Sequence, residues 1–246
     1  MSDSEDEVEF EKEQFDIGGF DLDITTIAFM PLSKLMLLNK SSTEISGQKL
    51  WCGSLAVCEY LLAHQDYCVD KYFIELGAGT GVAGMICAKL GAGHVCLTDH
   101  DQRSLDHMHT DCADNKIANT SVARFDWYSP DFGLFDATMA ALKGEVQVRL
   151  VAGDVIYKSL LIEPFFAVVR ELLMRYQTSG CSLLLCHIPR AGVSHEVVQA
   201  QMTRVGLAFT VVHGGGGADQ WTGGLVTRYS PEEDFSRAKL YIITLA

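Results

Sequence analysis

The sequence predicts an α/β fold in which a seven-stranded, mostly parallel sheet is covered by helices on both faces and ends in an antiparallel hairpin. From residue 71 onward, apolar runs of strand length alternate with helical segments, which is typical of parallel strands joined by crossover helices. A glycine-rich turn follows the first of these strands. The last two runs have no predicted helix between them, and a parallel pair needs a crossover, so we expect this pair to be antiparallel.

The elements follow from the spacing of apolar residues and from the breaks between them. Before residue 70 we expect two short strands, 20–29 and 34–39, around a turn at Pro31, and then a helix over 52–64. The expected core strands are 71–75, 94–98, 121–125, 146–153, 181–188, 207–213 and 239–245. The first expected core helix runs from the glycine-rich turn to residue 90, and the others cover 102–113, 159–176 and 194–205. The segment 130–145 is also helical in pattern.

The charge is concentrated at the N-terminus. Residues 1–23 hold ten acidic residues and one lysine, which leaves −4 of the total charge of −13 on the rest of the chain. We therefore expect residues 1–19 to be a disordered, solvated tail, with docking to a basic partner as the alternative. Residues 20–246 are expected to form one domain, with 20–70 preceding the seven-strand core of 71–246. The chain has no basic stripe, which argues against nucleic-acid binding.

Eight cysteines are scattered through apolar runs without a C-x-x-C pair, as expected for buried thiols in a reducing compartment. The acidic N-terminus does not resemble a signal peptide, and no apolar run is long enough to span a membrane. His100, His107 and His109 lie in a polar helical pattern, so we expect no metal site there. The expected compartment is the cytoplasm, with the nucleus as the alternative.

The segment FIELGAGTGVAGM, residues 73–85, contains the spacing G-x-G-x-x-G of dinucleotide-binding turns. It follows a strand, where sheets of this class bind ligands. Asp99 lies twenty residues after Gly79 and suits the ribose of any nucleoside cofactor, so it does not decide between cofactors. Glu75, at the strand end, would repel a pyrophosphate and attract a sulfonium, so its charge favours S-adenosylmethionine.

Four motifs occur in order: GQKLWCGSLAVCEYLL (47–62), ELGAGTGVAGM (75–85) with VCLTD (95–99), FDWYSP (125–130) and GDVIY (153–157). With them the chain resembles the class I, seven-β-strand S-adenosylmethionine-dependent methyltransferases, which have a Rossmann-like fold. More closely, it resembles their small protein-lysine methyltransferase branch. The glycine motif specifies only the superfamily, whereas Trp51, Asp126-Trp127 and Asp154-x-x-Tyr157 together are more specific.

The resemblance implies a role for each of these residues. Trp51 lines the methionine end of the cofactor, Asp99 takes the ribose hydroxyls, and Trp127 packs near the adenine with Asp126 as a candidate partner for its amino group. Gly153 and Asp154 face the transferred methyl group. The full expected cofactor set is Trp51, Glu75, Gly77, Ala78, Gly79, Gly81, Asp99, Asp126, Trp127 and Gly153.

Methyl transfer to lysine needs a neutral amine held in line, and a dry, aromatic-lined pocket reduces the cost of losing the proton. We therefore assign Asp154 to substrate capture and orientation and Tyr157 to shaping the pocket. Arg190 follows a buried strand, and contact with a substrate and support of its loop remain equally open. The residues after the fourth strand lack the Asn-Pro-Pro-Tyr typical of amide and exocyclic-amine methylation.

The sequence thus predicts a monomeric enzyme that uses S-adenosyl-L-methionine to methylate a lysine in a protein substrate, without nucleic acid or membrane as a partner. Three alternatives stay open. The chain could methylate a small molecule or another protein side chain. It could be a catalytically silent, methyltransferase-like binding module that uses its acidic tail. It could be a nicotinamide-dependent oxidoreductase.

Overall fold

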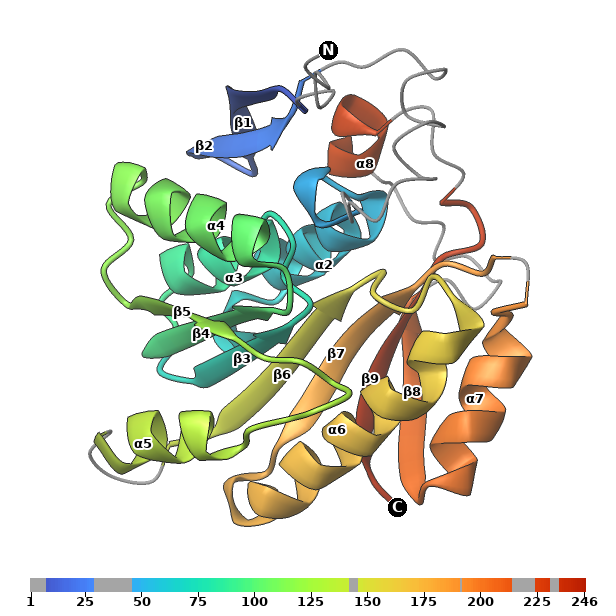
Figure 1. The fold of residues 1–246 in the computed structure, drawn as a ribbon. Helices are drawn as coiled ribbons and strands as arrows, with labels where there is room; N and C mark the ends of the chain where they lie inside the picture. The colour runs from blue at the N-terminus through green and yellow to red at the C-terminus, as the bar shows by residue number, and fades with distance from the viewer. Residues whose placement is uncertain (1–7, 29–45, 142–145, 191, 214–223, 231–234) are drawn as a thin grey trace, which may run out of the picture.

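The computed structural model describes residues 8–28, 46–141, 146–190, 192–213, 224–230 and 235–246, and these form the predicted α/β architecture (Figure 1). Its centre is a seven-stranded sheet in the order β5-β4-β3-β6-β7-β9-β8. The strands are β3 (Tyr72–Leu76), β4 (His94–Asp99), β5 (Thr120–Arg124), β6 (Val148–Gly153), β7 (Ser182–His187), β8 (Leu207–His213) and β9 (Lys239–Leu245). The five strands from β3 to β7 pair in parallel, which confirms the predicted fold class.

The last two strands pair antiparallel, as predicted, but β9 also lies between β7 and β8. Burial explains this order. Leu240, Tyr241 and Ile243 of β9 are fully buried, whereas Leu207 is the one residue of β8 that is buried. The more apolar strand therefore takes the inner position, and β8 becomes the edge. A short helix that the sequence did not predict, α8 (Gly224–Tyr229), lies between the two strands in the chain.

Helices cover both faces of the sheet (Figure 1). Alternate residues of each strand point to opposite faces, so Phe73 belongs to one apolar cluster and its neighbour Ile74 to the other. One cluster includes residues of α2 (Cys52–Ala63), α3 (Val82–Lys89) and α4 (Gln102–Asp114). The other includes residues of α5 (Gly133–Ala141), α6 (Ile162–Arg175) and α7 (His195–Arg204). Short 3-10 turns are η1 (Ser46–Gln48), η2 (Gln65–Tyr67), η3 (Ser159–Leu161) and η4 (Gln177–Ser179).

An N-terminal hairpin corrects the expectation of a disordered tail for residues 10–19, whereas residues 1–7 lie outside the described residues. Strand β1 (Phe10–Ile17) pairs antiparallel with β2 (Phe20–Ile27), so β1 is a partner of the predicted strand at 20–29. Gly18 and Gly19 join them with φ of 63° and 92°, the geometry that a two-residue hairpin turn needs. Residues 34–39 lie outside the described residues.

The hairpin is stabilised by an apolar face, whose residues alternate in the sequence with acidic ones. Phe15, Ile17, Leu22 and Ile24 are buried in the same cluster as α2, α3 and α4. The hairpin is therefore part of the core and covers the helices on this face of the sheet (Figure 1).

All eight cysteines fall within the described residues, and all are buried and free of disulfides. None of the described helices has the length and apolar character to cross a membrane. The same residues include no group of histidine, cysteine and carboxylate side chains that could hold a metal ion.

The strand order creates a switch point between β3 and β6. From β3 the chain proceeds outward to β4 and β5, and it then returns to the other side of β3 to form β6 and β7. The carboxyl ends of β3 and β6, at Leu76 and Gly153, therefore flank a crevice of the kind in which open α/β sheets bind ligands.

Candidate functional site

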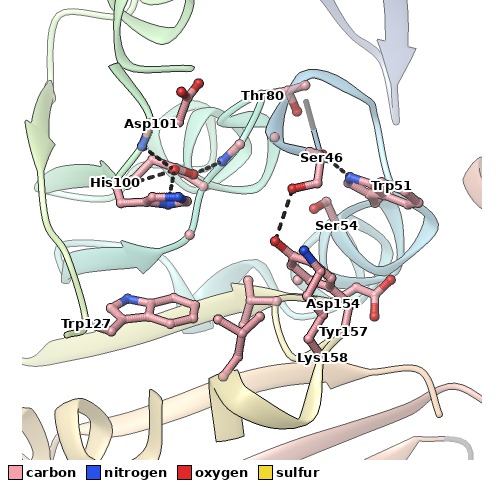
Figure 2. Close-up of a pocket in the computed structure, with 18 of the residues that line it drawn as sticks. Ser46, Trp51, Ser54, Thr80, His100, Asp101, Trp127, Asp154, Tyr157 and Lys158 are labelled. Atoms are coloured by element: carbon pink, nitrogen blue, oxygen red, sulfur yellow. Dashed lines mark hydrogen bonds and ion pairs between the residues drawn. The ribbon is translucent and has the colours of Figure 1, made fainter. Parts of the chain in front are cut away.

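A pocket of about 500 Å³ opens at this switch point (Figure 2). Its walls come from the segment that leads into α2 and from the loops after β3, β4, β5, β6 and β7. Ten of the residues expected from the sequence line it: Trp51, Gly77, Ala78, Gly79, Asp99, Asp126, Trp127, Gly153, Asp154 and Tyr157. Glu75 and Gly81 do not.

The loop after β3 needs glycine for two separate reasons. Gly77 and Gly79 have φ of 67° and 57°, a region that residues with a Cβ rarely adopt. A Cβ on Gly77 would also lie 3.0 Å from Val155, and one on Gly79 would lie 3.0 Å from the carbonyl oxygen of Gly47. The backbone therefore forms a close-fitting floor for the pocket. Gly81 has a structural place instead, because it caps the N-terminus of α3 with φ of 75°.

Glu75 corrects the reasoning by which the sequence favoured a cationic cofactor. Its side chain is buried, and its Oε2 accepts a hydrogen bond of 2.8 Å from the N–H of Gly84 in α3. Burial raises the pKa of Glu75 to about 8, against the opposing effect of the Gly84 hydrogen bond. Its charge therefore does not face the pocket. The side chain points under the glycine loop and fixes the first turn of α3, a direction that strand spacing alone does not reveal.

Asp99 joins the ends of two strands at the pocket wall. Its Oδ2 accepts from the N–H of Gly79 at 2.9 Å, and its Oδ1 accepts from the N–H groups of His100 and Asp101 at 2.7 and 3.1 Å. Burial would raise the pKa of Asp99, but the His100 imidazole and these N–H groups outweigh it and hold that pKa below its ordinary value. The carboxylate is thus ionised and keeps acceptor capacity on Oδ2, since each oxygen has two lone pairs.

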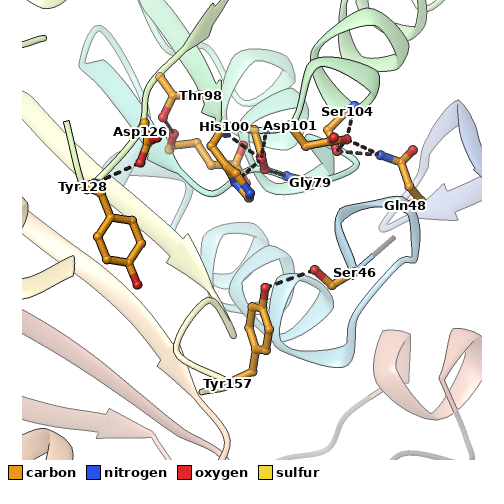
Figure 3. Close-up of polar contacts among 12 residues, drawn as sticks. Ser46, Gln48, Gly79, Thr98, His100, Asp101, Ser104, Asp126, Tyr128 and Tyr157 are labelled. Carbon is orange, nitrogen blue, oxygen red and sulfur yellow. Dashed lines mark hydrogen bonds and ion pairs between the residues drawn. The ribbon is translucent and has the colours of Figure 1, made fainter. Parts of the chain in front are cut away.

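The loop after β5 supplies an aromatic wall. The Trp127 ring packs edge-to-face on Phe165, with centroids 5.0 Å apart, and also limits the space at Gly77. Asp126 fixes this loop by accepting a hydrogen bond of 2.9 Å from the N–H of Tyr128 (Figure 3). The flat face of Trp127 and the glycine floor together suit a planar base.

Ser46 connects the two aromatic residues at the other end of the pocket, and sequence reasoning missed it. Its carbonyl oxygen accepts from Nε1 of Trp51 at 2.5 Å, and its hydroxyl lies 3.1 Å from the Tyr157 hydroxyl (Figure 2). Trp51 is also the N-terminal cap residue of α2. No sequence signal marks Ser46, because its importance depends on the meeting of η1 with the loop after β6.

Asp154 has a constrained backbone. Its φ of 59° is unusual for a residue with a side chain, and the residue is 6% exposed. A Cβ on Gly53 would lie 2.3 Å from the Asp154 Cβ, so α2 packs directly on this turn. Arg190 donates to both carboxylate oxygens, at 2.8 Å to Oδ1 and 2.5 Å to Oδ2. Of the two roles left open for Arg190, the structure shows it holding the Asp154 turn to its own loop.

The pocket contains further residues that the sequence did not single out. Lys49 lies over the Trp51 ring and Lys158 over the Tyr157 ring, with 5.0 and 5.1 Å from each Nζ to the ring centroid. Tyr128 and Leu160 are largely exposed at the rim, where the Tyr128 hydroxyl donates to the Leu160 carbonyl. Side chains of this kind occur throughout the chain, so only the folded arrangement distinguishes them.

The chain was compared with known protein families, curated proteins and solved structures. A family described as lysine methyltransferase matches residues 31–200. Protein-lysine N-methyltransferase EFM3 of Chaetomium thermophilum is 24% identical over 69% of this chain and 51% of its own length. Histone-arginine methyltransferase METTL23 of Xenopus laevis is 29% identical over 52% of this chain and 53% of its own. The chain thus spans about half the length of these curated relatives.

A third curated relative and a solved structure are also similar to this chain. Protein N-lysine methyltransferase METTL21A of Xenopus tropicalis is 31% identical, over 37% of this chain and 45% of its own. Among solved structures, SMU.776 in complex with SAH has a TM-score of 0.56 and 11% identity, over 96% of this chain and 56% of that one. At this identity the structural likeness concerns the fold alone.

Proposed function

The chain belongs to the lysine methyltransferase family, and we propose that it transfers a methyl group from S-adenosylmethionine to a lysine side chain of a protein. The observation that carries this proposal is the composition of one pocket. Its β4–β5 end offers a carboxylate and an aromatic wall for a nucleoside, and its β6–β7 end offers Asp154 and Tyr157 for an acceptor. Relatives that are named protein-lysine methyltransferases support a protein substrate.

The residues present fit the cofactor. In the proposal, the ionised Asp99 accepts the ribose hydroxyls, and Trp127 lies against the adenine with Asp126 near its amino group. The backbone of Gly77, Ala78 and Gly79 runs beneath the sugar, where the glycines leave room for close approach. Trp51 and Gly153 bound the methionine end. Glu75 and Gly81 contribute indirectly, by fixing the loop and the start of α3.

The protein's contribution to the reaction is positioning. When bound, the cofactor supplies a methyl group whose carbon–sulfur bond breaks as the acceptor's nitrogen lone pair forms the new bond, and sulfur keeps the electron pair. Asp154 accepts an N–H of the acceptor and so orients its lone pair. Tyr157, held by Ser46, forms an aromatic wall that disfavours the charged ammonium and excludes water. The proton that the nitrogen loses passes to solvent.

We propose a monomer in the cytoplasm, with the nucleus as the alternative, and with neither nucleic acid nor membrane as a partner. The acidic charge of −13 opposes binding to a phosphate backbone. Eight buried thiols, none of them in a disulfide, are consistent with a reducing compartment.

The test is methyl transfer from tritiated S-adenosylmethionine into a cell lysate, resolved by size, with the labelled amino acid identified after hydrolysis. We expect a labelled protein band that contains methyl-lysine and that is much weaker with Asp154→Asn. Asp136→Asn is the matched control, because Asp136 pairs with Arg175 outside the pocket. Label in small molecules, or in methyl-arginine as the name of one relative suggests, would replace the lysine assignment. Cofactor binding without transfer would indicate a silent binding module.

A further inference from the structure

The Asp154–Arg190 pair is built into the pocket and is not a chance surface contact. The Asp154 side chain is 1% exposed and that of Arg190 is 30% exposed, and the guanidinium meets the carboxylate in a two-pronged contact. A second bond from Arg190 Nη1 reaches the carbonyl oxygen of Ile188 at 3.1 Å. The backbones of Arg190 and Val193 exchange hydrogen bonds of 3.1 and 3.0 Å, which close the loop. Both partners are thus held in place before any acceptor arrives.

Several other groups lie near this carboxylate. Lys158 and Tyr157 follow it in the chain, and Lys49 lines the same pocket. From β7 come two buried groups. Burial and the charge of Asp154 raise the pKa of the Cys186 thiol, whereas burial and nearby positive charge, including that of Arg190, lower the pKa of His187. Helix α2 contributes Gly53 and Ser54, which carry no charge. Among the residues that the structure describes, the charged side chains besides Asp154 at this end of the pocket are Arg190, Lys49 and Lys158, all cationic.

This arrangement answers a difficulty in the proposed reaction. A buried carboxylate by itself would stabilise an acceptor ammonium and raise its pKa, which lowers the reactive fraction. Since the Arg190 guanidinium already neutralises Asp154, the pair attracts an ammonium only weakly while its oxygens still have lone pairs for an N–H.

We infer that Arg190 is a positioning residue that makes the Asp154 carboxylate receive the acceptor as a neutral amine and not as an ammonium ion. The inference rests on the proposed methyl transfer and extends it, because it assigns the choice of protonation state to one ion pair. Without Arg190, the carboxylate would act as a counter-ion. The acceptor would then bind as well or better, and it would react more slowly at neutral pH.

The test compares pH profiles of kcat and KM for wild type and Arg190→Gln, with the protein substrate identified in the lysate assay. We expect the acidic limb of the kcat profile to move up by about one pH unit, which is a tenfold loss of kcat on that limb. We expect KM to stay equal or fall and kcat to recover above the shifted limb. Arg190→Lys keeps a positive charge, so its limb should stay close to that of wild type.

The matched control is Arg204→Gln, because Arg204 pairs with Glu163 at an exposed site. It should leave the profile unchanged. A uniform loss of kcat at every pH, or a raised KM without a shifted limb, would show a purely structural or substrate-contacting Arg190 and overturn the inference. If Arg190→Gln does not fold, Asp154→Asn serves in its place. In this variant the Arg190 guanidinium lacks its anion and disfavours the ammonium form, so the acidic limb of the kcat profile should move to lower pH. A limb that does not move would overturn the inference. A wild type that labels no protein would overturn the proposed function itself.

Discussion

The N–H of Gly84 donates a hydrogen bond of 2.8 Å to Oε2 of Glu75, and this contact lies beneath the pocket, outside its lining. It ties the end of β3 to the first turn of α3, so the glycine loop between them is anchored on both sides. The carboxyl group that the sequence suggested as a ligand is therefore part of the support of the loop.

The first prediction concerns Glu75→Gln. Because burial raises the pKa of Glu75 to about 8 from 4.5, the folded state binds a proton that the unfolded state has released between these values. The stabilisation that protonated Glu75 contributes to the wild type is therefore complete below pH 4.5 and is lost as the pH rises from 4.5 to about 8. Glutamine keeps an acceptor for Gly84 without ionising. Relative to wild type, the variant should gain about 3 kcal/mol of unfolding free energy between pH 5.5 and 7.5.

Urea unfolding at several pH values measures this gain. Glu163→Gln, at an exposed site, is the control and should show no comparable trend. A Glu75→Gln curve that runs parallel to that of wild type would mean that the carboxyl group is ionised in the fold.

The second prediction has the opposite sign and concerns His187. Its Nδ1 lies 3.0 Å from Nδ1 of the buried His195, whose Nε2 bonds the Arg237 carbonyl oxygen, so His195 in its neutral form accepts from His187. Burial, together with nearby positive charge, lowers the pKa of His187 to about 3. The unfolded state thus takes up a proton first as pH falls below 6.5, and stability is lost in that direction.

His187→Gln keeps a donor for His195 but cannot be protonated. Between pH 6.5 and 5, wild type should lose about 2 kcal/mol that the variant does not lose. Thermal melts across this range measure the difference. If both proteins lost the same stability between pH 6.5 and 5, His187 would not be a cause of the acid sensitivity.

The third prediction concerns Asp99→Asn. This change removes the charge and one acceptor oxygen next to Gly79, and a hydrogen bond to a charged group is worth about 1.5–3 kcal/mol. Affinity for S-adenosylmethionine, measured by calorimetry, should therefore fall about 10- to 100-fold. Asp106→Asn, on the outer face of α4, is the matched control and should bind normally. Unchanged affinity of Asp99→Asn would assign the ribose to another group.

Much of the fold could be predicted because apolar runs and their breaks carry the signal. The strands at 207–213 and 239–245 have the predicted bounds. Strand β1 was missed because Glu11 and Glu13 give an acidic composition to a segment whose apolar residues, Phe15 and Ile17, make contact only once the chain turns back at Gly18. Composition describes a segment, whereas a hairpin depends on its partner.

In the candidate site, too, some features could be predicted from the sequence and others could not. Residues at strand ends, such as Asp99 and Asp154, could be placed near one another because the carboxyl ends of parallel strands share an edge. The pairing of Asp154 with Arg190 could not be predicted, since it requires β6 and β7 to be neighbours and Asp154 to adopt positive φ. The direction of Glu75 was inaccessible for a similar reason, because it depends on where α3 begins.

The last prediction tests the packing of α2 against the Asp154 turn. A Cβ at Gly53 would lie 2.3 Å from Cβ and 3.0 Å from the backbone nitrogen of Asp154, so Gly53→Ala must push the helix and the turn apart. Overpacking of this kind costs about 1–3 kcal/mol. Because the turn itself moves, we expect methyl transfer to fall by more than tenfold even at temperatures where the variant is fully folded, while affinity for S-adenosylmethionine changes less.

Gly224→Ala provides the comparison, because a Cβ there would meet none of the described residues within 4 Å and the residue lies at the exposed start of α8. It should be close to wild type in both stability and activity. The comparison matters because alanine favours helices over glycine, so Gly53→Ala in α2 would stabilise the protein if packing did not intervene. Gly53→Ala with wild-type kcat and raised stability would show that α2 can move without disturbing Asp154, and the position of the carboxylate would then not depend on this packing.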